Sequence, residues 1–210
     1  DGRVLLCGGY DEGSNNYLDT ATIYDPATDR WSSAARMPGK QSLHSQSTLA
    51  DGRALLCGGR DGIRGCRDLA VIYDPATDRW SPAASMPEKR YDHSQSTLAD
   101  GRVLVCGGRD DDRYLDSATI YNPTTDRWSP AARMPGKWSL HSQSTLADGR
   151  VLVCGGQDDG SNEFDTAVIY DPAIDRWSSA PRLPGTRHRH SQSTLADGRV
   201  LVCGGYDDGY

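Results

Sequence analysis

Long apolar runs are missing from this chain of 210 residues. Its apolar stretches are short, such as Val4–Cys7, whereas a membrane-spanning helix needs about 18–20 consecutive apolar residues. An excess of positive charge is missing too, because 23 Lys and Arg stand against 29 Asp and Glu, a formal charge of −6. We therefore expect neither a membrane partner nor a nucleic-acid partner. The opening Asp1-Gly2-Arg3 lacks the basic and apolar regions of a signal peptide, which leaves a processed product, an engineered chain or a fragment open.

Helical periodicity is also missing, since no stretch places apolar residues at i, i+3, i+4 and i+7 between helix caps. The chain instead repeats itself. Asp-Gly-Arg-x-Leu-x-Cys-Gly-Gly begins at positions 1, 51, 100, 148 and 197. Each full repeat goes on to Tyr-Asp/Asn-Pro, Asp-Arg-Trp and His-Ser-Gln-Ser-Thr-Leu-Ala. The repeats are therefore 1–50, 51–99, 100–147 and 148–196, with a partial repeat at 197–210, and we expect them to form one domain over 1–210.

Each repeat predicts four short strands, here named A to D. Around the first repeat boundary, strand A is expected at 44–50 and strand B at 53–59, joined by the hairpin dipeptide Asp51-Gly52. Strand C, β-branched and aromatic, follows at 69–74. Pro75 opens the next turn, and strand D runs from Trp80 to near Pro87, which cannot continue a ladder. The sequence therefore predicts an all-β fold of four-stranded antiparallel sheets.

The Gly and aromatic positions carry a family resemblance. Gly8-Gly9, Tyr24 and Trp31, with their counterparts in every repeat, resemble the kelch motif, a diglycine at the end of strand B followed by a separated Tyr and Trp. Kelch domains are β-propellers, usually of six or seven blades, and serve mostly as protein-binding modules. Some relatives, similar to galactose oxidase, are enzymes. The resemblance implies a propeller over essentially the whole chain, with its blades packed through these aromatic rings.

The number of strands bears on how such a ring would close. The repeats predict 17 strands, one more than four closed four-stranded blades can hold. We predict four blades, with the C-terminal strand A at 190–196 completing the first blade. One strand B, either 2–9 or 198–205, is then spare. A fragment of a larger ring and strand exchange between chains are the alternatives, and a spare edge strand predicts a homo-oligomer.

Differences between the repeats predict a binding face. The A–B and C–D turns hardly vary, whereas nearly all variation falls in the B–C and D–A loops at the other end of the sheets. Loops on a rigid scaffold often carry binding function. The B–C loops are 10–18, 60–67, 109–115 and 157–164, and the D–A loops are 40–43, 89–92, 137–140 and 187–189. The expected contact residues are Tyr10, Lys40, Arg60, Arg90, Tyr91, Arg109, Trp138, Arg187, His188 and Arg189.

The expected partner is a protein or peptide. Acidic residues gather in the B–C loops and cations in the D–A loops, and the resemblance implies a grip on acidic or polar peptides. Three alternatives remain open at this point: a solvated rim without a partner, a self-associating structural or engineered repeat protein, and an enzyme resembling the propeller oxidases.

The equivalent histidines and cysteines are candidate chemical sites. A ring of His44, His93, His141 and His190 could hold a transition metal, but repetition alone places any residue in a ring, so a structural role is favoured. Five cysteines share one strand position, which predicts small buried hydrophobes, and Cys66 stands apart as a candidate reactive thiol. Abundant thiols favour a reducing compartment such as the cytoplasm. No phosphate-binding, hydrolase or metalloprotease motif occurs, so we expect no cofactor and no catalysis.

Overall fold

The structure, a computed structural model, describes residues 2–63 and 65–207. In these ranges the chain forms strands and turns without a helix, so none of the described segments is a helix able to cross a membrane. The all-β prediction is confirmed. The chain divides into two compact parts, Asp1–Tyr91 and Asp92–Tyr210.

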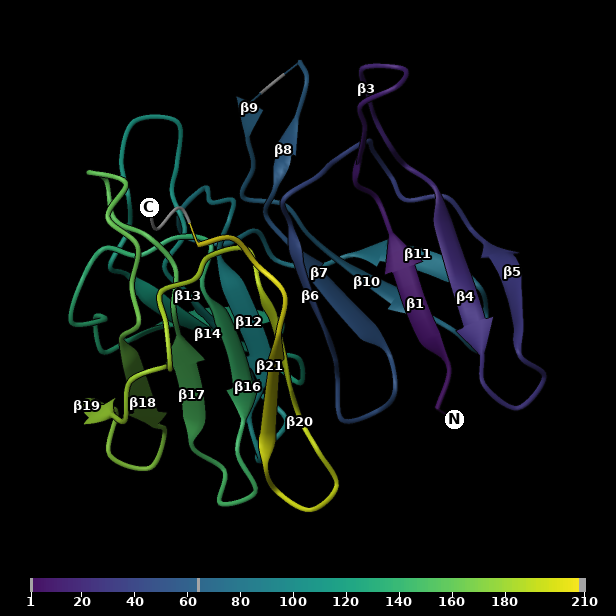
Figure 1. Ribbon diagram of the computed structural model, residues 1–210. Coiled ribbons are helices and arrows are strands. Elements are labelled where there is room, and N and C mark those ends of the chain that lie inside the picture. Colours follow the sequence, from purple (N-terminus) through teal and green to yellow (C-terminus); the bar gives the residue numbers. More distant parts are fainter. Residues whose placement is uncertain (1, 64, 208–210) are drawn as a thin grey trace. The chain divides into compact units, whose positions relative to one another are not determined.

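The N-terminal part contains two larger sheets (Figure 1). Sheet 1 has the order β1-β4-β5, with β1 at Val4–Cys7, β4 at Ala21–Asp25 and β5 at Arg30–Ala34. Sheet 2 has the order β6-β7-β10-β11, at Ser45–Thr48, Ala54–Cys57, Ala70–Asp74 and Arg79–Pro82. Two small hairpins extend the B–C loops: β2 (Tyr10–Asp11) with β3 (Asn16–Tyr17), and β8 (Arg60–Asp61) with β9 (Gly65–Cys66).

The C-terminal part repeats the same meander. Sheet 3 runs through β12 (Ser94–Thr97), β13 (Val103–Cys106), β14 (Ala118–Asn122) and β15 (Arg127–Ala131). Sheet 4 runs through β16 (Ser142–Thr145), β17 (Val151–Cys154), β18 (Ala167–Asp171) and β19 (Arg176–Ala180). A terminal sheet contains only β20 (Ser191–Thr194) and β21 (Val200–Cys203).

The strand predictions A to D are confirmed in each repeat, with shorter bounds because the ends curl into turns. The last strand A is β20, and its described partner is β21, with Ser191 opposite Cys203 and Thr194 opposite Val200. The expected pairing of this strand with the first sheet is not among the described pairings. Ring closure, blade number and the single-domain assignment therefore stay predictions.

The core lies between neighbouring sheets of one part. Strand B of repeat 3 reads Val103-Leu104-Val105-Cys106 and is fully buried, as expected for a strand covered on both faces. In the C-terminal part Leu98, Leu104, Ile120, Val151 and Tyr170 belong to one buried cluster that spans sheets 3 and 4. A sheet from one repeat cannot bury both faces alone, which is why the sheets stack.

The invariant turns are held by their own aspartates. In the A–B turn the Asp51 carboxylate accepts bonds from the backbone N–H and the side chain of Arg53 at 3.1 and 2.8 Å. In the C–D turn the Asp74 carboxylate accepts the Ala76 N–H at 2.9 Å. These Asx-type contacts are local, so the turns need no partner to keep their shape.

A second aspartate of the C–D turn ties one sheet to the next. Asp78 has φ 52°, in the left-handed region, and its counterparts Asp29, Asp126 and Asp175 have φ between 51° and 53°. Its Oδ1 accepts the Tyr73 hydroxyl of its own sheet and the Ala35 N–H of sheet 1, both at 2.8 Å. The Trp80 indole N–H donates to the Ala35 carbonyl at 2.8 Å. The same latch joins sheets 3 and 4 through Asp175, Trp177 and Ala132. The Tyr and Trp of the kelch resemblance thus bind sheet to sheet, as the resemblance implied.

Candidate binding face

The Gly-Gly pair at the end of strand B holds the following D–A loop close to its sheet. We call this contact the diglycine seam. In the four full repeats the second glycine of the pair donates its N–H to a D–A loop carbonyl, as in Gly59 to Arg90 and Gly108 to Trp138, both at 2.8 Å. The first glycine lies still closer: a Cβ placed on Gly155 would come within 2.5 Å of the Arg187 carbonyl oxygen. Only glycine allows this approach together with its φ of 65°. The invariant glycines therefore hold the variable loops in place.

The last residue of each D–A loop has a left-handed backbone. Leu43, Asp92, Leu140 and Arg189 have φ between 54° and 59°, a conformation uncommon for residues other than glycine. In the C-terminal part this turns the loops toward each other, since the Leu140 N–H donates to the Asp92 carbonyl and the Arg189 N–H to the Leu140 carbonyl, both at 2.9 Å. Neighbouring loops thus support one another through their backbones.

A hollow of about 460 Å³ opens on the loop end of the N-terminal part. The β2–β3 hairpin forms one wall and the β8–β9 hairpin the other, with Lys40 between them. Ile63 is 94% exposed and Tyr10 is 44% exposed. Exposed apolar groups beside polar ones mark binding sites on protein surfaces. The lining residues are Tyr10, Asn15, Asn16, Tyr17, Lys40, Asp61, Gly62 and Ile63.

The walls of this hollow, which we call the loop hollow, are stiffened by local bonds. Asp11 accepts the Gly13 N–H and Asp61 the Ile63 N–H, each at 3.0 Å, so both hairpin tips are Asx turns. Asp61 also pairs with Arg67. Within the β2–β3 wall the paired Tyr10 and Tyr17 rings meet edge to face at 5.1 Å.

The polar side chains of the hollow are aimed at one another. The Lys40 ammonium donates to Asn16 Oδ1 at 2.9 Å, and the Tyr10 hydroxyl donates to Asn15. Because these side chains sit on stiff loops, a ligand would meet them in one fixed arrangement. Preorganised contacts of this kind cost little entropy on binding.

Other predicted contact residues of the N-terminal part are less accessible. The Arg60 guanidinium lies over the Tyr91 ring at 4.8 Å, and Tyr91 is buried. Arg90 is only 1% exposed, and its guanidinium lies 3.2 Å from the Glu88 carboxylate. Arg60 thus remains half-buried at the surface, whereas Arg90 and Tyr91 support the loops from below.

In the C-terminal part Trp138 also points inward. Its ring is buried in the core cluster and lies 5.6 Å from the Phe164 ring. Arg109 is half-buried, pairs with Asp92 at 3.0 Å and lies over the Tyr114 ring at 5.6 Å. Trp138 therefore anchors the D–A loop instead of offering a surface contact.

The last D–A loop carries Arg187, His188 and Arg189. His188 is buried, its Nδ1 lies 2.6 Å from Glu163, and its ring stacks on Tyr206 at 5.7 Å. Arg187 donates to the Gly204 carbonyl at 3.2 Å, while Arg189 is exposed. Of the three, only Arg189 is exposed.

The expected contact residues left out six residues that line the loop hollow: Asn15, Asn16, Tyr17, Asp61, Gly62 and Ile63. Of these, Ile63 had a sequence signal, since an isoleucine in the middle of the polar loop 60–67 has no strand role. The two asparagines had none, because their position depends on how far the β2–β3 hairpin leans toward Lys40.

The equivalent histidines point at cysteines. Nε2 of His44, His141 and His190 lies 3.7 to 3.9 Å from Sγ of Cys7, Cys106 and Cys154 in the preceding sheet. Burial raises the pKa of the Cys7 thiol to about 12. A buried, protonated thiol is a poor nucleophile and a poor metal ligand. Within residues 2–63 and 65–207, no three His, Cys, Asp or Glu side chains gather as a metal site.

The remaining cysteine prediction is corrected by burial. Cys66, expected as a reactive loop thiol, is buried at 1% exposure in β9. The hairpin β8–β9 folds its side chain inward, so reagents reach it poorly. Cys203, expected to be buried like its counterparts, is exposed because β21 is the last strand of the two-stranded terminal sheet.

The buried His44 and His190 make the stability of the fold depend on pH. Burial lowers the pKa of His44 and of His190 from 6.5 to about 4. As the pH falls below 6.5, these histidines bind protons in the unfolded chain before they do so in the folded one. Their contribution to the free energy of unfolding is therefore complete above pH 6.5 and is lost as the pH falls toward 4. We expect urea midpoints to fall between pH 7 and pH 5, with at most about 1.4 kcal/mol per pH unit from each histidine. H190Q should flatten this slope, and an unchanged slope would contradict the assignment.

The kelch-like motif recurs in each full repeat, and its Gly, Tyr and Trp residues form the latches and diglycine seams described above. Residues 1–205 match the family model described as the KLHDC2/KLHL20/DRC7 Kelch-repeats domain. The chain belongs to the kelch-repeat family. A solved structure titled "Structure of YjhT" is similar in fold, with a TM-score of 0.83 at 15% identity, and the match covers 100% of this chain and 76% of that one. No curated protein sequence matches the chain.

Membership confirms the resemblance and the propeller class of the fold. Kelch-repeat domains generally mediate interactions between proteins. That general role holds for the kelch-repeat family as a whole.

Proposed function

We propose that this kelch-repeat domain is a non-catalytic binding module that holds a protein or peptide on its B–C and D–A loops. The observation that carries the proposal is the loop hollow, where exposed Tyr10 and Ile63 flank Lys40. An apolar side chain of a partner fits between the two hairpins, and a carboxylate beside it would face the Lys40 ammonium. Half-buried Arg60 on the loops of the N-terminal part is a further contact residue. On the loops of the C-terminal part, half-buried Arg109 and exposed Arg189 are contact residues as well.

The state of the buried Cys–His pairs supports a role without catalysis. A Cys–His nucleophile needs a thiol whose pKa is lowered, whereas burial raises the pKa of Cys7 and of Cys154. The imidazoles beside them have lowered pKa values, so they stay neutral and do not stabilise a thiolate. The Cys–His pairs therefore have a packing role between neighbouring sheets.

The test is a peptide selection with a library of displayed peptides, followed by affinity measurements of the selected peptides. I63D places a carboxylate at the rim of the hollow and K40E reverses its charge. We expect each to weaken binding at least about tenfold, that is by about 1.4 kcal/mol or more. Both side chains are exposed, so the fold should be retained.

A matched control is present at the opposite end of the sheets. Ile174 in a C–D turn is also strongly exposed. I174D should leave affinity unchanged. If I174D abolished binding while I63D and K40E did not, the invariant turns would be the binding face and the proposal would be wrong.

A second candidate function is self-association through edge strands. It is favoured by one specific observation: in the described pairings β1 is the edge of sheet 1, and β21 is the edge of a sheet of only two strands. Unpaired strand edges are templates for pairing with another chain. Sedimentation over a range of protein concentrations tests it, and a single mass of one chain at every concentration would exclude it.

A further inference from the structure

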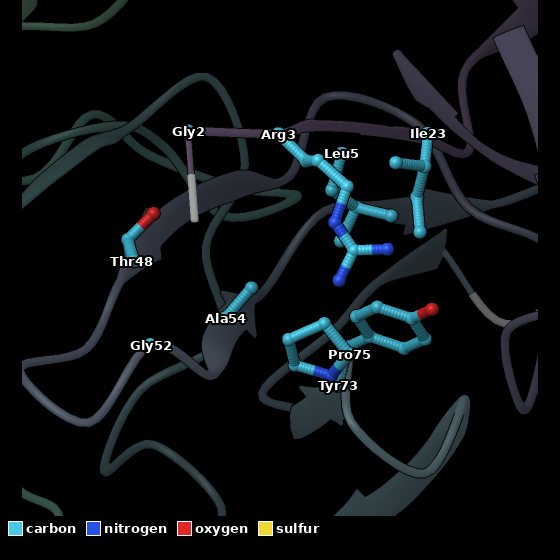
Figure 2. A pocket seen from close by; sticks show the side chains of 9 residues that line it. All are labelled: Gly2, Arg3, Leu5, Ile23, Thr48, Gly52, Ala54, Tyr73 and Pro75. Carbon is cyan, nitrogen blue, oxygen red and sulfur yellow. The ribbon is translucent and has the colours of Figure 1, made fainter. Parts of the chain in front are cut away.

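A second cavity, of about 260 Å³, lies beside β1 in the N-terminal part, at the end of the invariant turns. Figure 2 shows Arg3 extending over it toward Tyr73 and Pro75, with Leu5 and Ile23 on one side and Ala54 on the other. The other lining residues are Gly2, Thr48 and Gly52. We call it the β1 slot.

The same set of residues surrounds a leucine in the C-terminal part. Repeat 3 and repeat 4 place Leu104, Ile120, Val151 and Tyr170 at the positions of Leu5, Ile23, Ala54 and Tyr73. There they form one buried cluster with Leu98, which is 3% exposed. Leu98 directly follows β12, the strand A that pairs with β13. The β1 slot therefore has the shape and chemistry of a leucine site beside an edge strand.

The polar groups next to β1 match the same incoming strand. Gln143 accepts the Ser94 hydroxyl at 2.8 Å and donates to the Ser96 hydroxyl at 2.9 Å, both on strand A of the sheet before it. It also donates to the Leu104 carbonyl. Its counterpart Gln46 makes the corresponding bond to the Leu5 carbonyl at 2.8 Å. Two serines of a strand beside β1 would thus lie within reach of Gln46.

Resting on the self-association candidate, we propose that β1 and its slot take residues 191–195 of a second copy of this chain. Ser191 would lie opposite Cys7 and Thr194 opposite Val4, as their counterparts do in the pairing of β12 with β13. Ser191 and Ser193 would bond Gln46, and Leu195 would fill the slot. In the structure Leu195 is 38% exposed.

In this exchange the donor strand β20 keeps as many backbone pairings as it has with β21, and Leu195 gains a buried site. β20 now pairs with Val200–Cys203, whose sequence Val-Leu-Val-Cys is nearly that of β1, Val-Leu-Leu-Cys. Replacing one by the other conserves the ladder. Its contacts with sheet 4, such as Gln192 to Ser144 at 2.9 Å, lie on another side of the strand and are retained. The gain is the burial of Leu195, because an isolated two-stranded sheet leaves it exposed.

The association is head to tail, since donor and acceptor are different surfaces. Each copy donates one strand and accepts one, so the assembly closes into a small ring or grows as an open chain. This predicts how defective variants behave. L195D removes the donor and A54W fills the acceptor slot, so neither variant associates with itself, while a mixture of the two forms pairs through one intact donor and one intact acceptor.

The experiment is light scattering or sedimentation of the whole chain from about 1 to about 100 μM, where mass action separates monomer from assembly. We expect the mass to rise with concentration, self-association of L195D and A54W to be at least about tenfold weaker, and their mixture to recover a two-chain species. A peptide of residues 190–196 should compete with assembly of the wild type. I174D, which changes an exposed apolar side chain in a C–D turn outside the exchanged strands, is the matched control and should associate like the wild type.

The outcomes separate this inference from the function on which it rests. A monomer at every concentration overturns both the self-association candidate and the slot. Association that survives L195D, A54W and the peptide leaves self-association standing and overturns the slot. If A54W fails to fold, L195D and the peptide competition still decide. Binding at the loop hollow is measured independently by the I63D variant.

Discussion

G155A should lower the stability of the domain by about 2–4 kcal/mol, through overpacking and a left-handed backbone together. The new Cβ would lie 2.5 Å from the Arg187 carbonyl oxygen and 2.6 Å from Cε1 of His190. Neither neighbour can retreat easily, because the Arg187 carbonyl accepts the Gly156 N–H at 2.8 Å and the His190 ring lies against Cys154. The seam has to open for the methyl group to enter.

Thermal or urea unfolding of G155A measures this cost, and Gly185 supplies the control. A Cβ on Gly185 meets nothing within 4 Å, and its backbone is not left-handed. G185A should therefore change stability little or raise it slightly. Equal midpoints for the two variants would show that the diglycine does not hold the seam.

The glycine seams also explain why part of this fold is readable from sequence. Every repeat carries the same Gly-Gly, and every strand B reads as a short apolar run, so strand positions follow from local pattern alone. The turns are equally local: Asp51 bonds to Arg53, and Asp74 to Ala76. Interactions within a few residues leave a direct trace in the sequence.

The loops are different, because their side chains are oriented by contacts far along the chain. Trp138 and Arg90 have the residue types of interface hot spots, yet both are buried. Their carbonyls accept N–H bonds from Gly108 and Gly59, which pulls the D–A loop beneath the B–C loop. Variation between the repeats predicted the face, and residue type predicted the contact residues on it. The side of the loop that each residue occupies depends on these tertiary bonds.

The same reasoning applies to the latch aspartates. Asp78 and Asp175 stand in an invariant Thr/Ile-Asp-Arg-Trp string, and the sequence treats them as ordinary turn residues. Only the structure shows that each accepts a backbone N–H 43 residues away, from Ala35 or Ala132. Invariance among repeats can thus record a contact between sheets as well as the needs of a turn.

Removal of such a latch gives the second large effect. D175A leaves the Tyr170 hydroxyl and the Ala132 N–H without their acceptor, and Tyr170 is almost fully buried. Loss of the acceptor of the part-buried Tyr170 hydroxyl costs about 1–3 kcal/mol. The Ala132 N–H bond is exposed, so water can replace it in part and its loss adds about 0.5–1 kcal/mol. We therefore expect D175A to lose about 2–3 kcal/mol of stability. Asp175 also has φ 51°, which Ala adopts less readily than Asp.

The matched control for the latch is Asp29, the same position in repeat 1. Its Oδ1 accepts the Tyr24 hydroxyl at 2.8 Å, but in the described residues no backbone N–H from another sheet reaches it. D29A removes the bond to the Tyr24 hydroxyl and places Ala in the same left-handed conformation, but it breaks no described bond between sheets. Unfolding midpoints of D175A and D29A therefore compare the whole latch, with its part-buried Tyr170 bond and its Ala132 N–H bond, with an exposed tyrosine bond alone. We expect D175A to be the more destabilised by at least about 1 kcal/mol; equal losses would mean that the aspartate serves its own turn and that the sheets are joined by Trp177 and apolar packing alone.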